Sequence, residues 1–186
     1  KPPLRPEAEA CAAARAKFRA SDPALEAIFE AAKRSYTANA VDCLTDCPTR
    51  ERAGWLGDTF FTGRASQWLT GSGRNERLFL ENYLMPKKFG DFEKLKGLVP
   101  AVYPVDLMTE TCFIPNFTMW FVQELEEHCR RNGDRAFREA FRKRVLECIA
   151  CLDRYCNSDG LLEDLPGWIF LEWSQANKLV RDVNYP

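Results

Sequence analysis

Apolar residues at helical spacing, bounded by proline and glycine, run through most of this sequence. Segment 21–40 is an example, because Ser21 or Asp22 can cap a helix and Pro23 takes the first helical position. Its apolar residues recur every three or four positions, which predicts one buried face. That face consists of Leu25, Ile28, Phe29, Ala32 and Tyr36. No segment alternates convincingly as a half-buried strand would, so the sequence predicts an all-α fold.

Other helices are predicted between similar signals. Gly71 and Gly73 end a segment with four residues spaced for burial. These four are Phe61, Ala65, Trp68 and Leu69. Asn116 can cap the helix that follows a proline-containing stretch at 86–115. The predicted helices cover residues 6–20, 21–40, 58–70, 74–85, 117–131, 134–155 and 171–183.

The predicted helices are grouped in pairs. Within a pair the connection is a short turn that contains glycine, such as TGSGRNE at 70–76 or RRNGDRA at 130–136. Longer polar loops at 43–58, 86–115 and 157–171 separate the pairs. Successive helical hairpins of this kind are typical of a solenoid or a toroid, and no sequence repeat supports a named solenoid family. The long loops are expected on one rim, where a site can form.

Charge and hydropathy limit the class of partner. The chain of 186 residues carries 26 Lys and Arg against 27 Asp and Glu, a formal net charge of −1. This balance gives no electrostatic reason to expect nucleic acid or an anionic membrane surface. No apolar run approaches the ~18 residues of a membrane span. We therefore expect neither nucleic acid nor a membrane as a partner.

Eight cysteines raise the question of a metal site. They stand at positions 11, 43, 47, 112, 129, 148, 151 and 156. The segment CIACLDRYC at 148–156, with His128 upstream, has a spacing that zinc sites use. Cys148, however, shares a predicted helical face with Phe141, Val145, Ile149, Leu152 and Tyr155, which favours a small core residue. We expect no metal, no cofactor and no disulfide framework.

The segment DCPTRERAGWLGD, at 46–58, concentrates charge around one aromatic ring. Its carboxylates are Asp46, Glu51 and Asp58. In the simpler interpretation Asp58 caps the next helix, and the arginines at 50 and 52 form weak surface ion pairs. In the other, glycines on both sides of Trp55 allow a tight backbone that presents the ring beside the carboxylates.

A sugar needs this combination of groups. Its hydroxyls bind carboxylates and arginine, and its C–H face packs on a flat aromatic surface. Glycoside hydrolysis further requires a carboxylic acid that protonates the leaving oxygen. The loop is therefore a candidate carbohydrate site.

The loop also resembles the signature of a known family. TDCPTRERAGWLGD, at 45–58, is similar to that of the bacterial α-L-rhamnosidases of glycoside hydrolase family 78, which are (α/α)6 six-hairpin glycosidases. Two further segments resemble the family in the same order, FIPNFTMWFVQELEEHCRRNGD at 113–134 and LPGWIFLEWS at 165–174. The resemblance covers about residues 25–176. It implies helical hairpins that form part of a toroid.

The resemblance also implies roles for the loop residues. Glu51 would be the general acid, while Asp46 and Asp58 would hold sugar hydroxyls. Arg50 would bind the sugar or orient a carboxylate, and Trp55 would form a pocket wall. Trp168 and Trp173 are weaker candidates for further walls. The family inverts at the anomeric carbon, so a second carboxylate, ~6.5–9.5 Å from the first, would activate water.

The chain is expected to be part of a larger unit. It starts without an initiator Met or a signal peptide, which indicates a processed product or an excerpt. We count about three hairpins, so residues 1–186 would be a single partial catalytic domain of a six-hairpin toroid. The remaining half would supply the general base, and we expect these residues alone not to turn over substrate. The compartment, cytoplasmic or periplasmic, stays open.

Electrostatics adds one hypothesis. A general acid that works near neutral pH needs a raised pKa, which an arginine contact would oppose. We therefore expect Glu51 to lie toward Asp46 or Asp58, with Arg50 and Arg52 paired elsewhere. Three alternatives stand beside the rhamnosidase hypothesis: a six-hairpin glycosidase for another sugar, a non-catalytic carbohydrate-binding domain, and a helical interaction domain whose charged loop is only a solvated cap.

Overall fold

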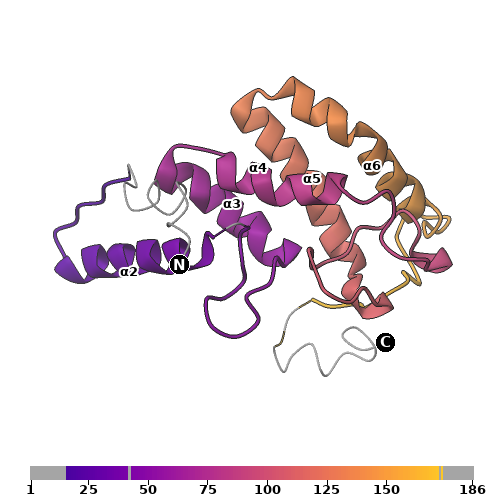
Figure 1. Cartoon of the computed structure of the whole chain (residues 1–186), viewed down its shortest axis with the longest axis horizontal. Helices are drawn as coiled ribbons and strands as arrows, with labels where there is room; N and C mark the ends of the chain where they lie inside the picture. The colour runs from indigo at the N-terminus through magenta and orange to yellow at the C-terminus, as the bar shows by residue number, and fades with distance from the viewer. Residues whose placement is uncertain (1–15, 42, 172, 174–186) are drawn as a thin grey trace. The chain divides into compact units, whose positions relative to one another are not determined.

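A computed structural model describes residues 16–41, 43–171 and 173, and these form helices and loops without a β-strand (Figure 1). The all-α prediction is confirmed. The chain divides into two compact units, Lys1–Glu81 and Asn82–Pro186. Their helices are α2 (Pro23–Asn39), α3 (Leu56–Thr70), α4 (Arg74–Glu81), α5 (Pro115–Asn132) and α6 (Arg135–Asp153), with short 3₁₀ helices η1 (Asn82–Leu84), η2 (Glu93–Leu95) and η3 (Glu110–Cys112).

Helix α2 begins where its sequence signals predict. The Asp22 carboxylate accepts a hydrogen bond from the amide of Ala24 at 2.8 Å, and Pro23 takes the first turn. Its predicted apolar face is wrong in part, because Leu25 and Ile28 are 49% and 64% exposed in the described structure. Tyr36 is the buried member of that face.

Tyr36 joins the three helices of the first unit. Its hydroxyl lies 2.6 Å from the hydroxyl of Ser66 on α3 and accepts a hydrogen bond from the Asn75 amide of α4 at 3.0 Å. Its ring packs with Ala40 and Leu44, and Leu69 contacts this small cluster. The end of α2 is therefore held against both members of the α3–α4 hairpin.

The buried face of α3 differs from the predicted one. Phe61, Ala65 and Trp68 are exposed, Trp68 by 82%, whereas Leu69 is partly buried. The face turned inward is made mainly of small and polar residues: Leu56, Gly57, Thr59, Phe60, Gly63 and Ser66. Small side chains let α3 approach its neighbours closely, so the predicted pattern of large apolar residues missed this face.

The α3–α4 hairpin turns at a left-handed glycine, as predicted. Gly71 has φ 70° and donates its amide to the carbonyl of Gln67. A methyl group at Gly63 would lie 2.6 Å from Oε1 of Glu76, which is fully buried on α4. The buried Glu76 side chain thus packs directly against the backbone of α3 at Gly63.

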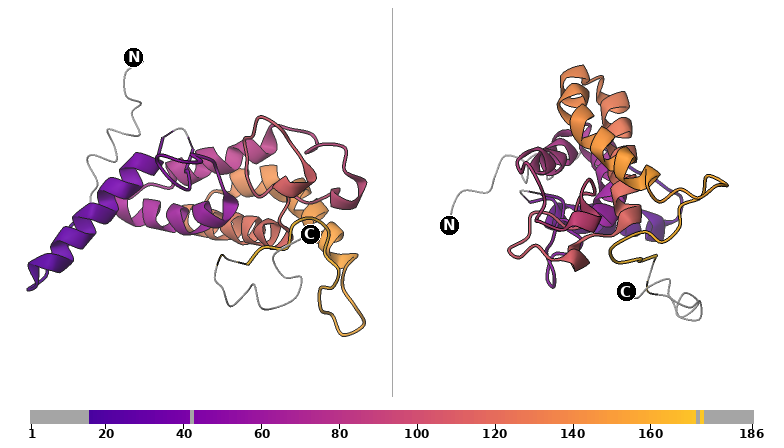
Figure 2. Two further views of the ribbon diagram at one scale, coloured as in Figure 1. Left: turned by 90° about the horizontal axis from the view of Figure 1, so that it is seen from below. Right: turned by 90° about the vertical axis from the view of Figure 1, so that its right-hand side faces the viewer.

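In the second unit, α5 and α6 form an antiparallel pair that lies side by side in both views of Figure 2. Gly133, with φ 65°, ends α5, and the Asp134 carboxylate caps α6 by accepting from the amide of Phe137 at 2.9 Å. The predicted cap of α5 is wrong. Pro115 starts this helix, and the Asn116 amide instead donates to the carbonyl of Phe170 at 2.9 Å.

The stretch between η1 and α5 contains no α-helix, as predicted, and it packs on the α5–α6 pair through aromatic side chains. Tyr83 contacts Phe89, Tyr103 and Phe121 with ring centroids 5.9, 5.4 and 5.0 Å away. A buried cluster of this kind orders a long connection without regular structure.

Only part of each helix that was predicted at the ends of the chain can be compared with the structure. Residues 16–20 are described and are not helical, so the predicted helix 6–20 is wrong at its carboxyl end. Its residues 6–15 lie outside the described part. The predicted helix 171–183 also falls almost wholly outside it, and described residues 171 and 173 are not helical.

The contact at Gly63 makes a stability prediction. Replacing an ordinary helical glycine with alanine raises the free energy of unfolding by roughly 0.5–1 kcal/mol. We expect Gly63→Ala to lower it instead, by about 1–3 kcal/mol, because the new methyl group overlaps a buried glutamate. Urea denaturation measures the change, and Ala65→Gly at an exposed position of the same helix calibrates the helix propensity alone. A more stable Gly63→Ala variant would contradict the close packing.

Candidate active site

The loop that carries the charged sequence starts from the anchored end of α2. Ala40 donates its amide to the carbonyl of Tyr36 at 2.9 Å and forms an isolated bridge with Leu44. Thr45 donates both its amide and its hydroxyl to the carbonyl of Asn39, at 3.0 and 3.1 Å. Leu44 is fully buried. The chain therefore enters the candidate site from a fixed position.

Residues 46 and 53 close the loop on itself. The amide of Asp46 donates to the carbonyl of Ala53 at 3.0 Å, and the amide of Ala53 donates to Oδ1 of Asp46 at 3.0 Å. The carboxylate of Asp46 is thus a structural member of the loop. Residues 47–52 form a compact excursion between these two hydrogen-bonded positions.

Glu51 lies on this excursion with two partners. Oε1 accepts a hydrogen bond from Nη2 of Arg50 at 2.8 Å, and Oε2 accepts one from the indole Nε1 of Trp55 at 2.9 Å. The hypothesis that both arginines pair elsewhere is therefore wrong for Arg50. The contact is with a single guanidinium nitrogen, and the Arg50 side chain is 82% exposed.

The strained backbone position in this loop is Arg52, and not one of the glycines on either side of Trp55. Gly54 and Gly57 are buried, and neither has a positive φ. The left-handed conformation instead falls on Arg52, at φ 52°, which is uncommon for a residue with a side chain. The turn between Glu51 and Trp55 is thus made at Arg52 and not at a glycine.

Asp58 is not the cap of α3. The N-cap position belongs to Trp55, which makes no capping hydrogen bond with its side chain, and Asp58 stands in the first turn. Partial burial and, after it, the negative charge of Asp46 raise the pKa of the Asp58 carboxyl above 3.8. A hydrogen bond from its own backbone amide lowers this pKa by less, and Glu51 raises it least of all. The residue keeps an exposed surface, so water screens these charges. The charge of Asp46 therefore acts on Asp58 more strongly than that of Glu51.

Asp46 experiences the opposite environment. Partial burial raises its pKa, but hydrogen bonds from the Cys47 thiol and from backbone amides, that of Ala53 among them, outweigh this and leave the pKa below its ordinary value. Asp46 is therefore kept ionised, while Asp58 holds its proton to higher pH.

Two residues of this arrangement were missed in the sequence. Cys47 supports Asp46 through its thiol, and its sulfur accepts the amide of Glu51 at 3.3 Å. Ala53 supplies the backbone groups that close the loop. The position of Cys47 next to an aspartate was visible, but hydrogen bonds to backbone atoms leave no mark on composition or spacing.

A comparison with protein families identifies the domain. The family model described as the bacterial alpha-L-rhamnosidase 6 hairpin glycosidase domain matches residues 13–184. The chain belongs to this family. No curated protein and no solved structure gives a significant match.

Membership of the six-hairpin glycosidase family confirms the resemblance and the helical-hairpin architecture inferred from the sequence. It also makes this a glycosidase-type domain, whose substrate class is carbohydrate. The roles of single residues and the predicted domain boundaries stay predictions.

The tryptophans that were candidates for further pocket walls lie in the other unit of this rhamnosidase-family domain. Trp168 and Trp173 surround Phe170, with ring centroids 5.1 and 4.9 Å from it. Trp168 also donates its amide to the carbonyl of Phe113 at 2.8 Å. Trp173 is 70% exposed. The two residues belong to one aromatic cluster, whose position relative to loop 46–58 is not described.

The cysteines of the domain are free thiols in the described part of the chain. Cys148 is fully buried, which confirms it as a core residue, and burial raises the pKa of its thiol to about 12. Within the described ranges, no group of three or more His, Cys, Asp and Glu residues could hold a metal ion.

None of the described helices is long and apolar enough to cross a membrane.

The raised pKa of Asp58 predicts a pH-dependent stability. The fold favours the protonated carboxyl, so this contribution is complete below pH 3.8 and is lost as the pH rises through the higher pKa of the folded state. We expect Asp58→Asn to unfold at a higher temperature than wild type near neutral pH, and the two to converge below 3.8. Thermal unfolding by circular dichroism measures both.

The control for this prediction is Asp106→Asn, at an exposed position of the second unit. It should leave the unfolding temperature unchanged at both pH values. A neutral-pH unfolding temperature below that of wild type for Asp58→Asn would show that the ionised carboxylate makes a favourable contact instead.

Proposed function

We propose that the domain takes part in inverting hydrolysis of a terminal α-L-rhamnoside, with loop 46–58 as the acid side of the active site. The observation that supports this most is the pair of hydrogen bonds that hold the Glu51 carboxylate, from Arg50 and from the indole of Trp55, in a loop whose Asp58 has a pKa raised by partial burial and by the charge of Asp46. An indole hydrogen-bonded to Glu51 adds the flat ring that a sugar face needs.

In this proposal Glu51 protonates the glycosidic oxygen. Its side chain is 43% exposed and its carboxylate accepts a hydrogen bond from Trp55, so its direction is set before substrate arrives. The contact with Arg50 is exposed, and ion pairs of this type are worth only about 0–1 kcal/mol, so the hydroxyls of a bound sugar can replace it.

The other two carboxylates, Asp46 and Asp58, have different proposed roles. Asp46 stays ionised because the loop supplies hydrogen bonds to it, which suits an acceptor of sugar hydroxyls. Asp58 has a raised pKa, so it is a second candidate for the proton donor. Substitution of each acid separately distinguishes these two assignments.

The proposal includes a partner for the acid. Inversion needs a base that activates water on the opposite face of the sugar, ~6.5–9.5 Å from the acid. We assign it to a later hairpin of the six-hairpin toroid, outside these 186 residues. The described domain would then be about half of a catalytic unit, and the experiments below use the longest natural chain that contains it.

The first experiment is hydrolysis of an aryl α-L-rhamnoside. Glu51→Gln keeps the shape of the acid and removes its proton, so we expect a loss of roughly a hundred- to ten-thousand-fold in kcat. Asp58→Asn should affect KM more than kcat if Asp58 only binds sugar. Glu30→Gln, an exposed residue of α2, is the matched control and should be unchanged.

The remaining outcomes of this experiment are also informative. Equal activity of wild type and Glu51→Gln, with a large loss in Asp58→Asn, would transfer the acid to Asp58. Activity only on another aryl glycoside would favour a six-hairpin glycosidase for a different sugar. Sugar binding without turnover of any glycoside would indicate a non-catalytic carbohydrate-binding domain and would refute the proposal.

The indole of Trp55 gives a second, smaller prediction. Trp55→Phe keeps an aromatic wall but removes the hydrogen bond to Oε2 of Glu51. We expect kcat to fall about tenfold, because the hydrogen bond that orients the Glu51 carboxylate is lost. Trp68→Phe, at an 82% exposed position of α3, is the matched control and should behave as wild type. An unchanged kcat in Trp55→Phe would count against the contact in the working enzyme.

A further inference from the structure

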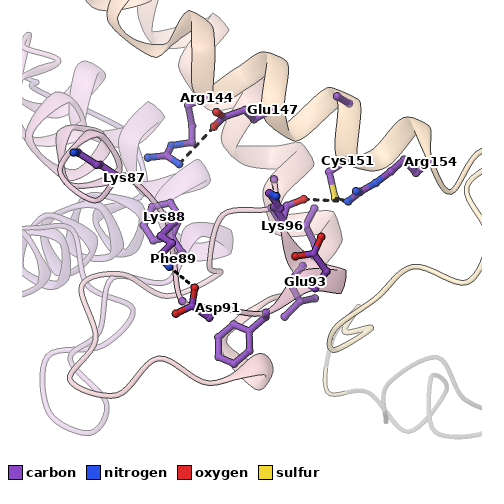
Figure 3. A pocket seen from close by; sticks show the side chains of 16 residues that line it. Lys87, Lys88, Phe89, Asp91, Glu93, Lys96, Arg144, Glu147, Cys151 and Arg154 are labelled. Carbon is purple, nitrogen blue, oxygen red and sulfur yellow. Dashed lines mark hydrogen bonds and ion pairs between the residues drawn. The ribbon is translucent and has the colours of Figure 1, made fainter.

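A cavity of about 720 Å³ lies in the second unit, between α6 and the loop at residues 87–98. Figure 3 shows Arg144, Glu147, Cys151 and Arg154 along α6, with Lys88, Phe89 and Lys96 on the loop. Its volume is in the range of small-molecule sites, which are roughly 300–1,000 Å³. All of its lining residues belong to this unit, so the cavity is separate from loop 46–58.

Arg144 of α6 and Arg154, which directly follows this helix, hold the loop that forms the opposite wall of the cavity. Nη2 of Arg144 donates to the carbonyl of Pro86 at 2.5 Å, and its guanidinium lies over the ring of Phe89, 4.8 Å from the centroid. Nη2 of Arg154 donates to the carbonyl of Lys96 at 3.0 Å and contacts the Cys151 sulfur at 3.1 Å. The loop is therefore tied to α6 at both ends of the cavity.

A glycine brings the loop against the helix between these ties. Gly97 has φ 104°, and a methyl group there would lie 2.7 Å from the carbonyl oxygen of Glu147 and 2.8 Å from Cβ of Cys151. The backbone of the loop thus forms a fixed edge of the cavity.

The lining carries more positive than negative charge. Its basic residues are Lys87, Lys88, Lys96, Arg144 and Arg154, and its acidic residues are Asp91, Glu93 and Glu147. Five positive charges against three negative ones leave an excess of two. The chain as a whole has a net charge of −1, so the cavity differs from the average surface.

Part of this charge is already neutralised inside the lining. Lys88 pairs with Asp91, and Arg144 lies 3.7 Å from Glu147. The ammonium groups of Lys87 and Lys96 make no ion pair or hydrogen bond among the described residues. The carboxylate of Glu93, which also lines the cavity, makes no ion pair or hydrogen bond among these residues either. Two uncommitted ammonium groups against one uncommitted carboxylate leave the excess charge at the cavity positive.

We propose that this cavity binds a small molecule through a phosphate or carboxylate group, with Lys96 as the principal cation and Arg144 as a preoriented neighbour. Arginine and lysine beside a concave, partly apolar wall are the groups that bind such oxyanions. This inference goes beyond the proposed hydrolysis and does not depend on it, because it uses none of the residues of loop 46–58.

The test is calorimetric titration of the longest natural chain, at low ionic strength, with inorganic phosphate, D-glucuronate and D-glucose. We expect saturable binding of phosphate, of glucuronate or of both, and none of glucose. Phosphate alone would identify a phosphate site, and glucuronate alone a site for the carboxylate of a sugar acid. Absence of binding by both anions would overturn the proposal, as would equal binding of glucose.

A pair of lysine variants locates the binding. Lys96→Gln should weaken anion binding about tenfold or more, because one charge-assisted hydrogen bond is lost. Lys94→Gln is the matched control, since Lys94 is an exposed residue of the same loop that does not line the cavity. Equal weakening by both variants would show binding to surface charge in general and would refute the site. The glycosidase assay of Glu51→Gln is unaffected by either outcome.

Discussion

The hydroxyl of Tyr36 is the contact on which the first unit depends. It is bonded to Ser66 and Asn75, so one buried polar atom joins α2, α3 and α4. A buried network in which every member has a partner specifies one arrangement of its helices, because a shift of any member would leave a polar group unsatisfied. Residues 40–55, which include most of loop 46–58, connect α2 to α3. The Tyr36–Ser66 hydrogen bond joins these two helices and so positions both ends of the connection.

Within that frame the loop gives neighbouring carboxyl groups different chemistry. The hydrogen bonds that close the loop keep Asp46 ionised, whereas partial burial and two negative neighbours favour the proton on Asp58. Glu51 lies between an arginine and an indole N–H. One short segment thus places carboxyl groups with different proton affinities close together in sequence. This is the same segment that resembles the family signature, and its role in hydrolysis is the proposal made above.

Sequence reasoning succeeded where the deciding contacts are local. Asp22 with Pro23, and Gly133 with Asp134, set helix ends through atoms a few residues apart, and the structure has these ends as predicted. It failed for α3, whose inward face is made mainly of small residues that show no apolar period, while Phe61 and Trp68 face outward. It also failed for the Arg50–Glu51 contact, because side-chain torsions decide whether two adjacent residues pair, and the sequence does not show these torsions. The charged loop itself was found through its residue types and its resemblance to a family signature.

The two hydrogen bonds between Asp46 and Ala53 make the loop respond differently to substitutions and to changes in its length. Exposed positions inside it, such as Thr49, point to water, and a different side chain there leaves both closing hydrogen bonds in place. An insertion or deletion between the two residues changes the length of the closed segment and moves Glu51 relative to Trp55. The loop should consequently tolerate variation in identity far better than variation in length, although loops on protein surfaces usually accept both.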